Sequence, residues 1–150
     1  MDSGSAFILE WRHIHGFLVH FPVALGITAF FAEIISVTSV NIVWRDLARR
    51  LLIVAMITAT LSAIVGLIAA AFLSESVSAS KENTLSVHRL LGLLTASGYV
   101  LCVFGNARRN QSPQTKSRVA LYWLALVTTV TLTTLAAAWG SSLSDIVRSK

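Results

Sequence analysis

Apolar residues run along this chain in four long stretches, separated by short segments that hold most of the charged side chains. The stretches cover residues of about 16–40, 51–73, 85–105 and 119–139. Each has about 20 residues or more, and a helix that rises ~1.5 Å per residue then crosses a ~30 Å hydrocarbon core. The stretches lack the amphipathic repeat that packs one apolar face into a water-soluble core. The pattern therefore predicts four transmembrane helices.

The segments between these helices are short, at roughly ten residues each, which favours an antiparallel up-and-down arrangement of neighbours. Backbone groups inside lipid must be satisfied within the chain, and a bundle of helices meets that requirement. We therefore predict an all-α fold in which residues 1–150 form a single transmembrane domain. Residues 1–11 are polar and acidic, unlike a secretory signal, so we expect the first helix to be kept.

The composition agrees with a lipid environment. Hydrophobic residues make up 55% of the chain and charged residues only 13%, too few to tile a water-soluble surface. A formal charge of +5 would suggest nucleic acid as the partner of a soluble protein. Here the basic residues lie beside the apolar stretches, so we interpret them as topology signals that contact anionic lipid, and we expect no nucleic acid.

The basic residues also predict an orientation. Residues 41–50 and 106–118 together hold seven Lys or Arg, whereas residues 74–84 hold only Lys81. By the positive-inside rule the first two segments face the cytoplasm, and both termini lie on the outer side. Aromatic residues fit the same placement, since Tyr122 and Trp123 would anchor the inner interface.

All four histidines fall in the outer half of the predicted bundle, and two of them suggest a cofactor site. His20 and His88 lie near the starts of the first and third helices, so their side chains should sit at similar depth. These two helices are diagonal in an up-and-down bundle, with axes about 11–14 Å apart when neighbours are ~8–10 Å apart. Such a gap can hold a flat macrocycle with one imidazole on each face. We therefore expect haem b, with His20 and His88 as axial ligands of the iron.

Small and basic residues extend this hypothesis. Ala24 follows His20 by four residues and Gly92 follows His88 by four, so both leave room on the same helix face for a ring edge. The same spacing is also used by membrane helices to pack closely. Arg89 and Arg12 lie at the outer boundary, where they could pair with haem propionates or extend to lipid headgroups.

His15 leaves the ligand set open. It could replace His20 as the haem ligand if the segment before the first helix folds inward, or it could bond to a propionate. A competing hypothesis is that His15, His20 and His88 bind zinc or copper without haem. His13 is expected to lie at the interface.

Glu33 is an acidic residue deep in a predicted helix, and such a carboxyl is a functional candidate as a proton carrier or quinone partner. The alternatives are an ion pair with Arg45 or Arg49, or a neutral protonated acid. Tyr99, Cys102 and the threonines of the fourth helix are expected to pack and to form hydrogen bonds.

The segment His15-Gly-Phe-Leu-Val-His20-Phe-Pro22-Val-Ala24-Leu25 resembles the opening motif of a bacterial family of four-helix membrane proteins, domain of unknown function 2231. His88 fits a further histidine near the start of that family's third helix, while Gly16 replaces its usual proline. The resemblance implies a haem-binding or redox-accessory protein of the bacterial inner membrane. Pro22 lacks an amide hydrogen, which suits a first helical turn, so the regular helix should begin near His20.

These observations predict a protein that binds haem b and transfers electrons in a membrane redox chain, rather than a stand-alone enzyme. Its partners would be the lipid bilayer, a redox protein or quinone, and other subunits of a membrane complex. Two alternatives remain open. The chain could be a cofactor-free structural or assembly subunit of a larger complex, or a small transporter of metal ions or protons.

Overall fold

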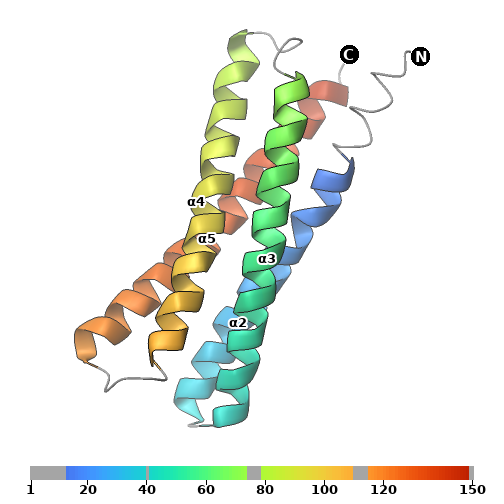
Figure 1. The fold of residues 1–150 in the computed structure, drawn as a ribbon. Helices are drawn as coiled ribbons and strands as arrows, with labels where there is room; N and C mark the ends of the chain where they lie inside the picture. The colour runs from blue at the N-terminus through green and yellow to red at the C-terminus, as the bar shows by residue number, and fades with distance from the viewer. Residues whose placement is uncertain (1–12, 40, 74–78, 110–114, 149–150) are drawn as a thin grey trace.

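The computed structural model describes residues 13–39, 41–73, 79–109 and 115–148. Nearly all of the described chain is helical, and it contains no strand. Four long helices follow one another as α2 (His20–Thr38), α3 (Ile42–Leu73), α4 (Ala79–Arg109) and α5 (Lys116–Arg148), as Figure 1 shows. The predicted all-α fold is therefore confirmed.

A short helical segment, residues 13–18, precedes α2 and is separated from it by a turn at Val19. Pro22 explains the break, because its ring removes one amide donor and crowds the carbonyl four residues earlier. The chain stays close to helical through the turn, since the Val19 amide still donates to the His15 carbonyl at 3.1 Å. The prediction that the regular helix begins near His20 is confirmed.

The helices extend beyond the apolar stretches that predicted them. α3 begins at Ile42, nine residues before the predicted position 51, and α5 continues to Arg148 rather than 139. Helix formation does not stop where hydrocarbon stops, because polar residues with good helix propensity continue the turns into water. At the start of α3, for example, Arg50 Nε donates to Asp46 Oδ2 at 2.8 Å across one turn.

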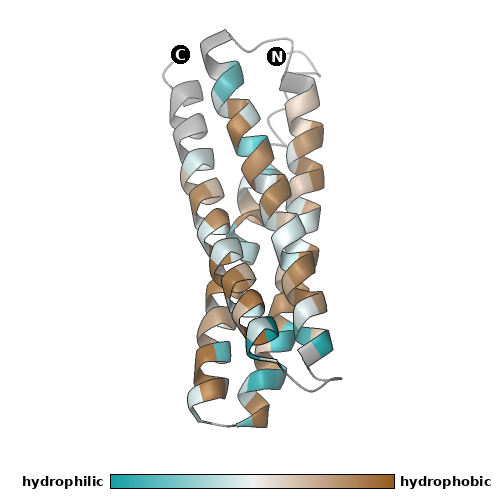
Figure 2. Cartoon of the chain, turned by 90° about the vertical axis from the view of Figure 1, so that its left-hand side faces the viewer, coloured by the Kyte–Doolittle hydropathy of each residue, from teal (hydrophilic) through white to brown (hydrophobic). Residues whose placement is uncertain are grey.

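The four helices form an antiparallel bundle (Figures 1 and 2). α2 packs against α3 and α5, and α4 packs against the same two helices, so among the described residues α2 and α4 are diagonal. We call the end of the bundle that holds residue 13 and the start of α4 the upper end. The lower end holds the α2–α3 and α4–α5 connections (Figure 1).

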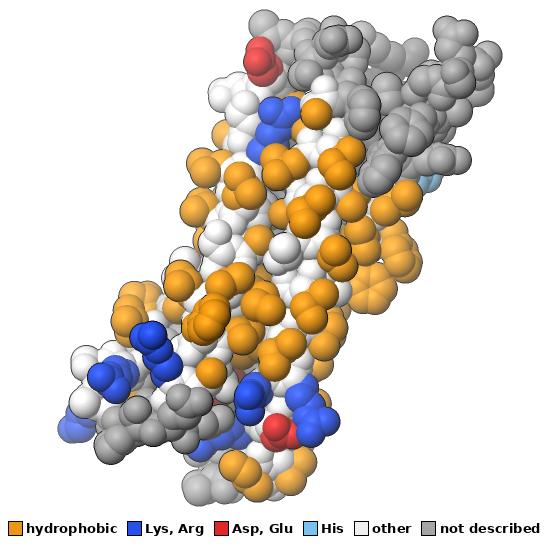
Figure 3. Space-filling model, viewed as in Figure 1, with side chains coloured by type: hydrophobic (Ala, Val, Ile, Leu, Met, Phe, Trp, Pro, Cys, Tyr) orange, Lys and Arg blue, Asp and Glu red, His pale blue; other side chains and the backbone are white. Residues whose placement is uncertain are grey.

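The outer surface of the bundle is apolar. All four helices are long and apolar enough to cross a membrane, and only 22–28% of each span is buried inside the chain. Large hydrophobic side chains cover the exposed middle of the bundle, while Lys and Arg gather at its lower end (Figure 3). Exposed apolar side chains over this length require lipid around them, so the chain is a multi-pass membrane protein.

The orientation in the membrane stays a prediction, and labelling can test it. The lower end carries both basic connections, so we expect it to face the cytoplasm. A cysteine introduced at Ser112 should resist an impermeant thiol reagent added to intact cells and react after the membrane is opened. Cys102 is buried, so its background labelling should be low. Reaction of the Ser112 variant in intact cells would reverse the topology.

Candidate functional site

Two histidines from different helices meet at the upper end of the bundle. The imidazoles of His15 and His88 lie with ring centroids 5.9 Å apart and their planes at 86°. His15 belongs to the helical segment before α2 and His88 to α4, so the pair spans the diagonal of the bundle. Both side chains are half-buried. This histidine pair is the candidate functional site.

His15 is held in place by α3. Its Nδ1 donates to the Ser62 carbonyl at 3.0 Å, because a carbonyl oxygen can only accept. The ring also lies on the backbone of Gly66, where an added Cβ would stand 2.8 Å from the His15 Cε1. With the proton on Nδ1, a neutral His15 has its Nε2 lone pair available as a ligand.

His88 packs against α5, and its ring also lies close to a glycine. An added Cβ at Gly140 would stand 3.0 Å from the His88 Cε1, so glycine is what allows the ring to approach the helix. The His88 Nδ1 is buried and, apart from the Ala136 backbone of α5 that lies near the ring, has no hydrogen-bond partner among the described residues. A buried polar atom without a partner is rare in folded proteins and often marks a site for water or a ligand.

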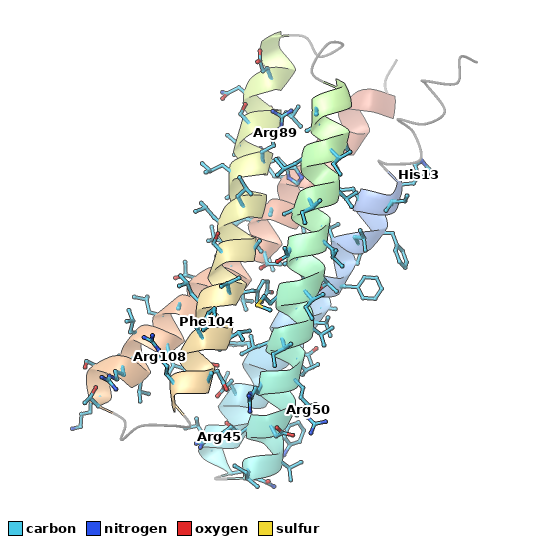
Figure 4. All side chains as sticks on the ribbon, viewed as in Figure 1. His13, Arg45, Arg50, Arg89, Phe104 and Arg108 are labelled. Atoms are coloured by element: carbon cyan, nitrogen blue, oxygen red, sulfur yellow. The ribbon has the colours of Figure 1, made fainter. Side chains whose placement is uncertain are left out.

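The two other residues predicted on α4 lie next to His88. Gly92 is half-buried one turn below it, and an added Cβ there would meet no atom within 4 Å. Arg89 reaches from α4 to α3, where its Nη2 donates to the Ala70 carbonyl at 3.0 Å (labelled in Figure 4). The Arg89 Nε is buried and has no partner among the described residues.

His20 and Ala24 lie away from this pair. Both are exposed on α2, and His20 Nδ1 donates to the carbonyl of Gly16 at 2.7 Å. Phe21 beside them is 42% exposed, so this face of α2 is turned to the surroundings of the bundle. The structure thus brings His15, rather than His20, beside His88. His13 is exposed at the upper end (Figure 4).

A metal site built from three protein ligands does not form in the part of the chain that the structure describes. No three residues among its His, Cys, Asp and Glu side chains come together in a group that could hold an ion. His20 is exposed and lies apart from His15 and His88, so the three histidines predicted to bind zinc or copper do not form one group.

Glu33 lies near the lower end in a second polar cluster. Its carboxyl is fully buried, and its Oε1 accepts hydrogen bonds from the Tyr122 hydroxyl at 2.6 Å and from Asn106 Nδ2 at 2.7 Å. Asn106 Nδ2 and the Tyr122 hydroxyl are themselves 3.2 Å apart. The cluster joins α2, α4 and α5.

Between the histidine pair and the Glu33 cluster, Tyr99 links α4 to α2 by a hydrogen bond. Its hydroxyl donates to the Pro22 carbonyl at 2.8 Å and accepts from Thr133 of α5 at 3.2 Å. The hydroxyl occupies the space where a side chain on Gly26 would lie. These contacts agree with the packing and hydrogen-bonding roles predicted for Tyr99 and for the threonines of the last helix.

Comparison with known proteins places the chain in a family. Residues 12–148 match the family described as "Predicted membrane protein (DUF2231)". The chain belongs to this family. No curated protein and no solved structure matches it significantly. The resemblance seen in the sequence is therefore confirmed for nearly the whole of this DUF2231 protein.

Sequence reasoning missed the partners of Glu33. Tyr122 was predicted to anchor the membrane interface, but it is 4% exposed and faces the centre of the bundle. Asn106 drew no attention because it ends an apolar stretch, where a polar residue is ordinary. A usable signal was the heptad-like spacing of Tyr99, Cys102 and Asn106, which puts three polar side chains on one face of α4.

Proposed function

We propose that this DUF2231 protein binds one haem b at the upper end of the bundle and passes electrons in a membrane redox chain. His15 and His88 would be the axial ligands. The observation that carries the proposal is the meeting of two imidazoles across the bundle diagonal, at 5.9 Å between ring centroids. The ligand set differs from the one first inferred from the sequence, because His15 takes the place of His20.

The spacing of the two rings suits a shared metal. Metal–nitrogen bonds of ~2.0–2.1 Å, measured for imidazole on zinc, would put two ring centroids on opposite sides of one metal about 6–6.5 Å apart. The histidine pair, at 5.9 Å, is close to that spacing, and a small outward shift of either ring would reach it. His15 can bind through Nε2, since its Nδ1 is engaged with Ser62, and this second bond would fix the ring as metal-bound histidines usually are.

The number of protein ligands favours haem over a bare ion. A structural zinc site takes four protein ligands and a catalytic one takes three, whereas a haem iron draws four nitrogens from its own ring and needs two axial ligands. The described residues offer two imidazoles and no group of three. A site for zinc or copper alone is therefore the weaker proposal.

The surroundings of the pair also suit haem. Open space at Gly92 lies on the same face of α4 as His88, one turn below it. Arg89, with a buried Nε that has no partner among the described residues, could hold a propionate. Haem would supply one-electron chemistry, and this chain would supply the ligands and an apolar enclosure that tunes the potential.

The membrane setting suggests where electrons would go. If the lower end faces the cytoplasm, the histidine pair lies near the outer face of a bacterial inner membrane. A redox protein or a quinone could exchange electrons there, with this chain as an electron-transfer or accessory subunit of a larger complex.

A visible spectrum of the protein, purified in detergent from cells supplied with haem precursor, tests the proposal. Two axial imidazoles should give an intense Soret band and the sharp reduced bands of six-coordinate low-spin iron. The pyridine haemochrome of the same sample identifies the haem as type b. Protein that is folded by circular dichroism but takes up no haem would support the cofactor-free structural subunit instead.

A further inference from the structure

The cluster at the lower end has a chemistry that the proposed haem site does not use. We infer that Glu33, Asn106 and Tyr122 form a proton-binding site, in which the Glu33 carboxyl exchanges a proton with the lower side of the membrane. The inference stands apart from haem, because it rests on residues at the opposite end of the bundle from His15 and His88.

The site is closed off from solvent by three helices. Glu33 is 0% exposed, Asn106 2% and Tyr122 4%. A carboxyl buried this deeply in a membrane protein is costly when ionised, so its surroundings decide which protonation state is favoured. Two hydrogen bonds to Oε1, at 2.6 and 2.7 Å, stabilise the ionised form.

The same partners can also stabilise the neutral form. A protonated carboxyl needs an acceptor for its O–H, and the Asn106 Oδ1 is a buried acceptor without a partner among the described residues. A half-turn of the Asn106 amide exchanges Nδ2 for Oδ1 and points that acceptor at Glu33. The Tyr122 hydroxyl can donate to either residue. The Asn106 and Tyr122 side chains therefore suit both protonation states of the carboxyl.

The packing indicates the side from which the proton comes. Ala29 and Leu126 stand four residues further from the lower end than Glu33 and Tyr122, and both are 0% exposed. Leu52 of α3 is 0% exposed too and belongs to the same apolar cluster. These side chains form an apolar layer above the carboxyl on α2, α3 and α5, while Cys102 of α4 lies at the same height. Below the carboxyl, the buried hydroxyl of Ser36 donates to the backbone carbonyl of Glu33 at 2.8 Å, so polar groups extend from the cluster toward the lower end.

Other titratable groups surround the cluster on each helix. Cys102 is buried on α4, one turn above Asn106. On α3 Arg45 is half-buried. The other charged side chains that the structure describes near the lower end are exposed, namely Asp46, Arg49, Arg50, Arg108, Lys116 and Arg118. The exposed cations lie in the predicted cytoplasmic interface, where they raise the local concentration of buffer anions that deliver protons.

Infrared difference spectroscopy of the full-length protein in lipid can test this inference directly. A protonated Glu33 should give a carboxylic acid C=O band that shifts in D₂O and with ¹³C-labelled glutamate. The band should grow as pH falls and disappear in Glu33→Gln, while the matched control Glu82→Gln, at an exposed position near the upper end, should keep it. Asn106→Leu removes, together with Oδ1, the Nδ2 donor that stabilises the ionised carboxyl, and it places an apolar side chain beside Glu33. The midpoint of the band's titration should therefore move to higher pH.

Two results would overturn the site. The band could be absent, or present unchanged, at every pH at which the protein stays folded, and either would mean a carboxyl with one fixed state. If Glu33→Gln does not fold, Tyr122→Phe keeps the carboxyl and removes only one donor. An unshifted titration in that variant would also count against the cluster. Neither measurement requires haem, so the Glu33 site can be tested even if the protein proves to bind no haem.

Discussion

Replacing either His15 or His88 with alanine should destroy the low-spin haem spectrum of the protein. Each variant would leave iron with at most one axial imidazole, so the spectrum should become five-coordinate and high-spin, or haem should be lost on purification. The expected effect is nearly complete for both variants, because neither ring has a nearby substitute among the described residues.

His20→Ala and His13→Ala are the matched controls. Both residues are exposed and lie within seven positions of His15, so their variants change the same helical region without touching the pair. Absorption and electron paramagnetic resonance spectra of the four proteins, at equal haem loading, distinguish the two ligand sets. A low-spin spectrum that survives His15→Ala but not His20→Ala would restore the sequence-based assignment and reject the geometry argued above.

The sequence could not decide between His15 and His20 for a geometric reason. Residues five apart on a helix point about 140° away from each other, so only one of the two can face the bundle centre. The small residues after His20 suggested an inward face, yet Ala24 is exposed. Small side chains fit a lipid-facing surface as well as a packed one, and the break before Pro22 adds an uncertain rotation between the two histidines.

The fold itself was accessible because it depends on patterns within single helices. Uncharged stretches of sufficient length predicted the spans, and short connections predicted that α2 and α4 would be diagonal. The Glu33 cluster was not accessible in this way, since Asn106 and Tyr122 reach Glu33 from two other helices. Contacts of that kind depend on how each helix is rotated about its axis, which an all-round apolar span leaves undetermined.

Hydrogen bonds in the bundle centre connect α2, α4 and α5. By fixing how these helices are rotated, they affect both the histidine pair and the Glu33 cluster. Tyr99 connects α4 to α2 and α5 between the histidine pair and the Glu33 cluster. Fully satisfied polar contacts in an apolar interior fix the rotation of the helices that make them. The same contacts that orient Asn106 toward Glu33 also fix the rotation of α4, and with it the direction of His88.

Gly98→Ala and Gly92→Ala should have opposite effects on stability, although both lie in α4. An alanine Cβ at Gly98 would overlap Thr129 of α5, whose Cγ2 would stand only 3.0 Å away. Thr129 cannot easily turn aside, because its hydroxyl donates to the Ala125 carbonyl at 2.7 Å. Overpacking of this kind costs about 1–3 kcal/mol, more than the ~1 kcal/mol that alanine gains over glycine in a helix.

Gly92→Ala meets open space and should keep that gain. Thermal unfolding in detergent, followed by circular dichroism, compares the two variants with the parent protein. Equal stabilisation by both would mean that α4 and α5 do not approach closely at Gly98.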